Sequence, residues 1–140
     1  MLSVLGRADK ILAQAPQKRK VNVKGIIAGE LNRQKSLYLY DLLWEDTQKW
    51  LEDIRGHPLA KQIIGSADSI CANIEEGFGR GYGKQLIQFY VYSLGSARET
   101  KGRLYRARAF YTLETLQKRL TLASEVVALI LTEINRQKHR

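Results

Sequence analysis

The 140 residues are enough for one domain with a single core and too few for two ordinary domains. A hydrophobic fraction of 44% and a charged fraction of 26% are typical of a folded globular domain and exclude global disorder. The 23 basic and 14 acidic residues give a net charge of +9, which favours nucleic acid as the partner and an anionic membrane second. The alternative is a charge that only keeps the protein in solution.

The charge is unevenly distributed along the chain. Residues 1–35 carry +6, 36–60 carry −3, 61–80 carry −1, 81–111 carry +5 and 112–140 carry +2. Two strongly basic regions therefore flank an acidic one.

Cysteine content and hydropathy indicate the compartment. Cys71 is the single cysteine, so an intrachain disulfide is excluded, and its apolar surroundings predict a small buried side chain. No apolar run approaches the roughly 20 residues needed to span a bilayer, and the N-terminus lacks an adequate signal-peptide core. We expect a cytoplasmic protein that does not interact with membranes.

The N-terminal residues fit a helical bundle poorly. Leu2 to Ala15 have the spacing of a short amphipathic helix, but the basic run from Pro16 to Lys20 interrupts it. We assign residues 1–33 to a basic arm and residues 34–140 to the folded domain.

Four apolar stripes with spacings of three and four predict four helices and no strand. Because the intervening loops are short, the expected fold is an all-α, antiparallel, up-and-down four-helix bundle. The stripes run through Tyr40, Leu43, Trp44, Thr47, Trp50, Leu51 and Ile54, ending at Gly56; through Ile63, Ala67, Ile70, Cys71, Ile74 and Phe78; through Leu86, Tyr90, Leu94, Ala97 and Leu104, from Lys84 toward Phe110; and through Leu113, Leu116, Leu120, Ala123, Val127, Ile130 and Ile134.

Two cations interrupt the third stripe. Heptad spacing from Leu94 places Lys101 and Arg108 on the line that faces the core. An unpaired buried cation is too unfavourable, so these side chains must extend to a bundle end, meet a carboxylate, or face a cavity or a subunit interface.

The sequence contains no recognisable catalytic or metal-binding pattern. His57 and His139 do not have metal-ligand spacing with Cys71 or with each other. Glu75 and Glu76 are adjacent and project about 100° apart on a helix, so they are expected to be solvated or to pair with a basic residue of the third helix. We expect no metal, no cofactor and no enzymatic activity.

The turn from Gly77 to Lys84 alternates glycine with aromatic and basic residues. Tyr82 occupies the position of the third glycine of a dinucleotide fingerprint, and no strand precedes the turn, so that motif is excluded. The turn either contacts nucleic acid or simply connects two helices through glycine caps.

The third predicted helix and the start of the fourth carry the main candidate contacts with a polyanion. Such a broad basic surface favours phosphate-backbone contacts with little base specificity, and solvated helix charge is the alternative. With the basic residues of the glycine-rich turn, the candidates are Arg80, Lys84, Arg98, Lys101, Arg103, Arg106, Arg108, Lys118 and Arg119.

Several motifs together resemble a known family. They are Gln62, Ser66 to Ile70, Asn73 to Arg80, Gln88-Phe89 and Gly95 to Glu99. Over about residues 36–135 the chain is similar to the bacterial four-helix-bundle proteins encoded in 23S ribosomal RNA intervening sequences. A structurally related group is the accessory variability determinant of diversity-generating retroelements.

The resemblance implies a basic, ring-shaped homopentamer without catalytic residues. In the related retroelement group such a pentamer binds a reverse transcriptase and nucleic acid. The segment that includes Asn73, Glu75, Glu76 and Gly77, together with Glu99, is implied to be structural, with Asn73 to Gly77 holding the second helix against the third.

Two hypotheses follow for function. The first is a non-catalytic, nucleic-acid-binding oligomeric scaffold, with RNA favoured over DNA and with a reverse transcriptase as a further partner. The second is a protein-interaction adaptor without nucleic-acid binding, supported by seven tyrosines and two tryptophans. A small enzyme is the least favoured class.

Overall fold

The computed structural model describes residues 24–81 and 83–139, and these residues form an all-α structure without strands. The predicted all-α class, with helices and no strands, is confirmed in this part of the chain. The expected N-terminal arm lies outside the described residues as far as residue 23. The helices are α2 (Lys24–Trp50), α3 (Gly56–Gly79), α4 (Lys84–Arg106), η1 (a 3₁₀ turn, Arg108–Phe110) and α5 (Leu113–Lys138).

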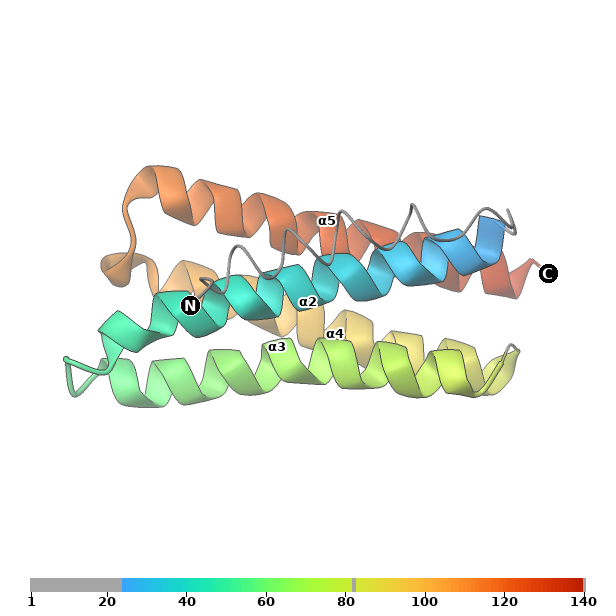
Figure 1. The fold of residues 1–140 in the computed structure, drawn as a ribbon, viewed down its shortest axis with the longest axis horizontal. Coiled ribbons are helices and arrows are strands. Elements are labelled where there is room, and N and C mark those ends of the chain that lie inside the picture. Colours follow the sequence, from blue (N-terminus) through green and yellow to red (C-terminus); the bar gives the residue numbers. More distant parts are fainter. Residues whose placement is uncertain (1–23, 82, 140) are drawn as a thin grey trace, which may run out of the picture.

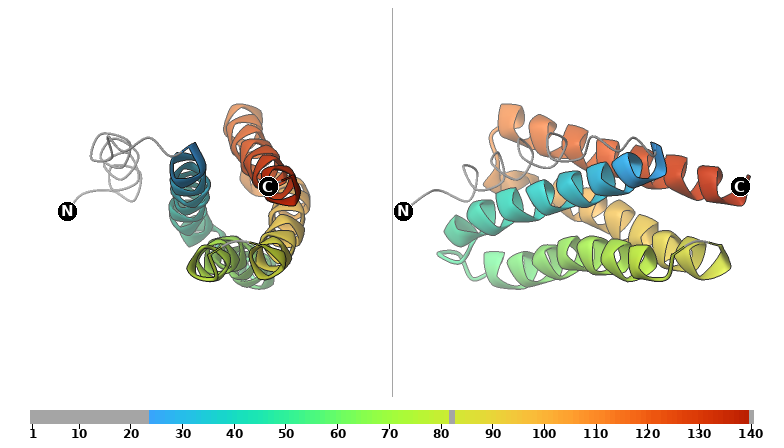
Figure 2. Two further views of the ribbon diagram at one scale, coloured as in Figure 1. Left: turned by 90° about the vertical axis from the view of Figure 1, so that its right-hand side faces the viewer. Right: turned by 45° about the vertical axis from the view of Figure 1, so that its right-hand side comes forward.

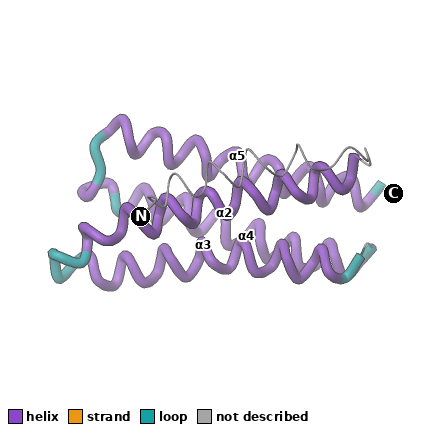
Figure 3. Tube along the Cα trace, in the orientation of Figure 1, coloured by secondary structure: helices purple, strands orange, loops and turns teal. Residues whose placement is uncertain are grey.

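The four long helices lie side by side in one bundle (Figure 1). Seen end-on, α2, α3, α4 and α5 follow one another around an arc (Figure 2, left), and short loops connect them at the two ends of the bundle (Figure 3). One end holds η1 together with the end of α2 and the starts of α3 and α5; it is the left end in Figure 1 and is called the η1 end below.

Helix α2 begins before the expected domain boundary and ends before the expected turn. It starts at Lys24, so the boundary placed between residues 33 and 34 falls inside a helix of the bundle. It ends at Trp50 rather than near Gly56, and Asp53 accepts hydrogen bonds from the backbone and guanidinium of Arg55 in the connecting turn. A Cβ on Gly56 would lie 1.9 Å from the Trp50 carbonyl oxygen, so glycine permits this close turn.

The buried side of α2 differs from the predicted stripe. Leu39, Leu43 and Trp50 are at most 1% exposed, whereas Trp44 and Ile54 are 47% and 86% exposed. The prediction extended one helix through residue 54, but the chain leaves helical geometry after Trp50, and Trp44 lies about 100° beyond Leu43 around the helix.

The other three stripes are largely buried, although Leu120 and Val127 within α5 are only partly buried and some residues at helix ends are exposed. Phe78, near the end of α3, is 44% exposed, and Leu113, the first residue of α5, is 72% exposed. Cys71 is buried, and burial first, then the nearby carboxylates, raises the pKa of its thiol to about 12. Cys71 therefore packs as a small apolar side chain, as predicted.

The expected position of Lys101 and Arg108 on the core-facing line is wrong. The buried line of α4 continues through Ala97, Thr100 and Leu104, each fully buried. Lys101 follows Thr100 and is turned about 100° away from it, and it is exposed. Arg108 lies beyond the end of α4, in η1, and is also exposed.

Hydroxyl groups and a glycine bring α3 and α4 close together. The Ser93 hydroxyl donates to the Ile70 carbonyl at 2.9 Å, and the Thr100 hydroxyl donates to Ser66 Oγ at 2.8 Å. A Cβ on Gly77 would lie 2.8 Å from the Tyr90 ring, so only glycine fits here without displacement. Short side chains thus allow the two helices to approach.

In the Asn73 to Gly77 segment Ile74 is part of the hydrophobic core, whereas the polar side chains make local contacts or face solvent. Asn73 Nδ2 donates to the backbone carbonyl and the hydroxyl of Ser69, one turn earlier in the same helix. Glu75 is exposed, and Glu76 accepts from Arg80 of its own helix at 2.8 Å rather than from a residue of α4. Within this segment the direct approach to α4 is made at Gly77.

Candidate nucleic-acid interface

The nine candidate cations differ first in whether they have a carboxylate partner. Four of them have one, and each ion pair neutralises part of the charge that would attract a polyanion. The pairs are Arg80 with Glu76 at 2.8 Å, Arg103 with Glu99 at 3.6 Å, Lys118 with Glu114 at 3.4 Å and Arg119 with Asp46 at 2.7 Å.

Arg119 belongs to the packing between α2 and α5. Its Nε and Nη2 donate to the two carboxylate oxygens of Asp46 at 2.7 and 3.1 Å, and the Tyr111 hydroxyl donates to Oδ2 at 2.7 Å. Burial first, and then the Asp46 carboxylate, raises the pKa of Tyr111 well above its usual value. This cation is therefore occupied inside the fold.

Arg103 also has a structural contact. Its Nη1 donates to the backbone carbonyl of Gln62 at 2.7 Å, which links α4 to the first half of α3. With Glu99 beside it, 26% of the Arg103 side chain remains exposed. Little of the Arg103 guanidinium is therefore available to bind a polyanion.

The other five candidates, Lys84, Arg98, Lys101, Arg106 and Arg108, are exposed, and none makes an ion pair within the described residues. Lys84 begins α4, at the end of the bundle opposite η1. The Arg106 guanidinium lies over Gly102, where a Cβ would be 3.2 Å from Nη1.

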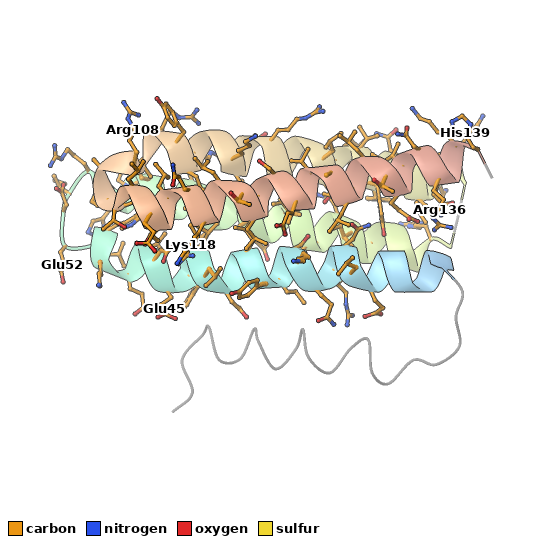
Figure 4. All side chains as sticks on the ribbon, turned by 90° about the horizontal axis from the view of Figure 1, so that it is seen from above. Glu45, Glu52, Arg108, Lys118, Arg136 and His139 are labelled. Carbon is orange, nitrogen blue, oxygen red and sulfur yellow. The ribbon has the colours of Figure 1, made fainter. Side chains whose placement is uncertain are left out.

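Three of these cations lie with an aromatic ring along one side of α4 and its continuation into η1, where Arg108 is located. Arg98, Lys101, Tyr105 and Arg108 follow at spacings of three, four and three, which places neighbouring side chains one helical turn apart. These four residues are called the α4 stripe below. Figure 4 shows Arg108 on the α4 side of the η1 end, with Lys118 nearer to α2.

Within the α4 stripe, Arg108 and Tyr105 are in direct contact. The guanidinium carbon of Arg108 lies 4.7 Å from the Tyr105 ring centroid, and its Nη1 donates to the Tyr105 carbonyl at 3.1 Å. Tyr105 is nevertheless 57% exposed. The sequence interpretation did not single out Tyr105, although its spacing of three residues from Arg108 is a signal for such a contact.

Two exposed glutamates lie away from Arg108 at the η1 end. Glu45 on α2 and Glu52 just after it lie away from Arg108 in Figure 4. Asp46, on the same helix, is the partner of Arg119. At the η1 end, Arg108 and these two glutamates thus lie on different sides of the bundle.

The glycine-rich turn connects α3 to α4. Gly81 and Gly83 have φ values of 85° and 91°, which favour glycine over residues with a side chain. The Arg80 guanidinium contacts Glu76 and also lies 5.5 Å from the Phe89 ring centroid. The turn has the geometry expected of a helix connection; Tyr82 lies outside the described residues.

A shallow apolar groove lies between α2 and α3 near the η1 end. It has a volume of about 490 Å³, and its wall includes Trp44, Leu51, Ala60 and Ile64. His57 also lines it, with Nε2 placed 2.7 Å from the Leu51 carbonyl oxygen. The sequence interpretation missed this groove because it assigned Trp44 and Leu51 to the core.

Two further classes of site were sought among residues 24–81 and 83–139. No three His, Cys, Asp or Glu side chains come together there in a group that could hold a metal ion. None of the helices in that part of the chain has the length and apolar character needed to cross a membrane.

Comparison with known proteins places the chain in a family. The model of the family described as 23S rRNA-intervening sequence protein matches residues 32–132. A crystal structure of a protein with unknown function from the S23 ribosomal protein family of Bacteroides thetaiotaomicron superposes with a TM-score of 0.71 at 22% identity, covering 77% of this chain and 98% of that one. At this identity the similarity concerns the fold alone. No curated protein matches the chain.

Proposed function

The chain belongs to the family of 23S rRNA-intervening sequence proteins, and from that premise we propose that it is a non-catalytic RNA-binding scaffold. The observation that carries the proposal is the α4 stripe. Arg98, Lys101 and Arg108 are exposed there without an ion pair in the described part of the chain. A polyanion that binds them need not displace a carboxylate.

Phosphate contacts are the mode of recognition that this surface favours. Lysine and arginine side chains on one side of a helix attract a phosphate backbone and release its counterions, which makes binding strongly dependent on salt. Such contacts position a nucleic acid without reading its sequence. RNA is the proposed ligand, in preference to DNA, because of the family to which the chain belongs.

The oligomeric state and the biological partner are further parts of the proposal. The up-and-down bundle assembles into a ring-shaped homopentamer in the cytoplasm, and the ring serves a reverse transcriptase as an accessory subunit. A ring would repeat the net charge of +9 around one assembly and strengthen its attraction for RNA. We expect light scattering to give a mass near that of five chains. A mass equal to one chain would contradict the proposed pentameric ring.

The RNA-binding part is tested by charge reversal. We expect the variant R98E/K101E/R108E to bind a structured RNA at least tenfold more weakly at low salt. If three phosphate contacts are lost, the slope of log K against log salt concentration becomes shallower by about 2. Fluorescence anisotropy at several salt concentrations measures both quantities.

The matched control reverses three exposed lysines outside the α4 stripe. Variant K49E/K61E/K138E changes the net charge by the same amount on α2, α3 and α5. It should retain more of the affinity than R98E/K101E/R108E. Equal losses in the two variants would show that only the total charge matters, and the stripe would then have no special role.

A second candidate function is that of a protein-interaction adaptor without nucleic-acid binding. The groove between α2 and α3 favours it, because Trp44 is 47% exposed and Leu51 49% exposed beside it. Exposed tryptophan in an apolar groove is typical of protein contact sites. If the adaptor reading is right, Trp44→Ala abolishes capture of the reverse transcriptase, while R98E/K101E/R108E leaves that capture intact.

A further inference from the structure

We infer that the α4 stripe binds single-stranded RNA in preference to a duplex, with Tyr105 stacking on an unpaired base. This inference rests on the proposed RNA-binding function and adds the class of RNA. Its basis is the contact between Arg108 and Tyr105, in which the guanidinium carbon lies 4.7 Å from the ring centroid. Despite this contact, Tyr105 is 57% exposed.

The Arg108 guanidinium packs against the Tyr105 ring in the absence of a ligand. The hydrogen bond from Arg108 Nη1 to the Tyr105 carbonyl, at 3.1 Å, fixes the guanidinium close to the backbone that carries the ring. The guanidinium therefore covers one side of the Tyr105 ring, and the rest of the ring is exposed to solvent. A base that stacks there meets a ring whose rotamers the Arg108 contact already restricts in part.

The neighbouring cations supply the backbone contacts that a stacked base needs. Lys101 precedes Tyr105 by one turn, and Arg98 precedes it by two, about 10 Å along the helix axis at 1.5 Å per residue. Glu99, the acidic residue nearest to them in sequence, pairs with Arg103 instead. A strand whose base lies on Tyr105 can therefore extend its phosphates past Lys101 and Arg98.

The presence of an aromatic ring between cations separates single strands from duplexes. In a duplex the base faces are covered by neighbouring bases, so a protein ring reaches only the backbone and the groove edges. In a single strand the faces are accessible, and stacking on one aromatic side chain changes affinity by about tenfold. The cations alone would bind both forms.

Tyr92 provides a matched control on the same helix. It is 52% exposed, similar to Tyr105, and its ring packs edge-on against Phe89 at 6.0 Å between centroids. It lies about 140° around α4 from Tyr105, away from the α4 stripe. Removal of this ring tests whether any exposed tyrosine of α4 has the same effect.

The experiment measures the affinity of the full chain for three labelled probes by fluorescence anisotropy. The probes are an unstructured 12-nucleotide RNA, the same RNA annealed to its complement, and a phosphodiester chain of equal length without bases. We expect Tyr105→Ala to weaken binding of the single strand by about tenfold and to leave the other two probes within twofold. Tyr105→Phe and Tyr92→Ala should bind all three as the unmodified chain does.

The outcomes separate this inference from the proposed function. If the unmodified chain binds none of the probes, the proposed RNA-binding function fails and the inference fails with it. If R98E/K101E/R108E loses RNA while Tyr105→Ala changes all three probes equally or none at all, the proposed function stands and the stacking role is overturned. Circular dichroism and light scattering of each variant confirm that the fold and assembly are unchanged.

Discussion

The Nε atom of Arg119 on α5 lies 2.7 Å from Oδ2 of Asp46 on α2, and both side chains are mostly buried, with 16% and 14% exposed. Tyr111, just before α5, donates a hydrogen bond to the same carboxylate oxygen. One acidic residue of α2 thus satisfies two groups at the η1 end. An arginine that sequence reasoning placed on a ligand-binding surface instead joins two helices.

Asp46→Ala should therefore destabilise the protein. It leaves the Arg119 guanidinium and the Tyr111 hydroxyl without their acceptor in a mostly buried place, which we expect to lower the free energy of unfolding by about 2 kcal/mol. Urea unfolding followed by circular dichroism measures the change.

The control for Asp46→Ala is Glu114→Ala. It removes an exposed partner of Lys118, at 3.4 Å, and should lower the free energy of unfolding by no more than about 0.5 kcal/mol. Similar losses in the two variants would contradict a special role for the Asp46 contacts.

Gly77→Ala tests the approach of α3 to α4. The added methyl would lie 2.8 Å from Tyr90 Cδ1 and 3.1 Å from Phe89 Cβ, so the two helices must move apart locally. We expect a loss of about 1 to 3 kcal/mol in the free energy of unfolding, despite the better helix propensity of alanine.

Gly65→Ala is the matched control for Gly77→Ala, in the same helix. Apart from its chain neighbours and the adjoining backbone of its own helix, no atom lies within 4 Å of the position that a Cβ at Gly65 would take, so the gain in propensity is unopposed. We expect this variant to raise the free energy of unfolding by about 0.5 to 1 kcal/mol. A gain at Gly77 of the same size would show that the contact with Tyr90 is not restrictive.

Tyr90→Phe should stabilise the protein at neutral pH. The Tyr90 side chain is fully buried, and its hydroxyl has no hydrogen-bond partner among the described residues. Removal of an unsatisfied buried hydroxyl while the ring is kept should raise the free energy of unfolding by about 1 kcal/mol. Thermal and urea unfolding at pH 7 measure it; a loss of stability would contradict the absence of a partner.

The difference in the free energy of unfolding between Tyr90→Phe and the unmodified protein should increase at alkaline pH. Burial first, then the Glu133 carboxylate, raises the pKa of Tyr90 from 10.0 to about 12. Above pH 10 the unfolded chain releases the Tyr90 proton while the folded chain retains it. The free energy of unfolding of the unmodified protein is therefore unaffected by this group below pH 10 and falls as the pH rises from 10 to 12. The advantage of Tyr90→Phe should therefore grow by about 2 to 3 kcal/mol over this range.

Much of the helical content was predictable because local spacing controls it. The predicted start at Lys84 and the break after Gly79 match the structure, since apolar periodicity and glycine act over a few residues. Trp44 was placed wrongly because it lies about 100° around α2 from the fully buried Leu43, and apolar spacing alone does not show which edge of the stripe faces solvent. The contact between Tyr105 and Arg108 was within reach of sequence reasoning, as both residues lie one turn apart.

The sequence by itself determined the all-α class, the presence of four long helices and the excess of positive charge in residues 81–111, because periodicity and composition are local properties. The pairs Arg80–Glu76, Arg103–Glu99 and Lys118–Glu114 join residues four apart and follow from helical spacing, whereas only the tertiary structure decided that Arg119 is paired. Asp46 and Arg119 are far apart in sequence, as are Arg103 and the Gln62 carbonyl, and no spacing rule connects them. These two contacts form only because α5 packs on α2 and α4 packs on α3, so the packing of the bundle removes Arg119 and most of Arg103 from the exposed basic surface.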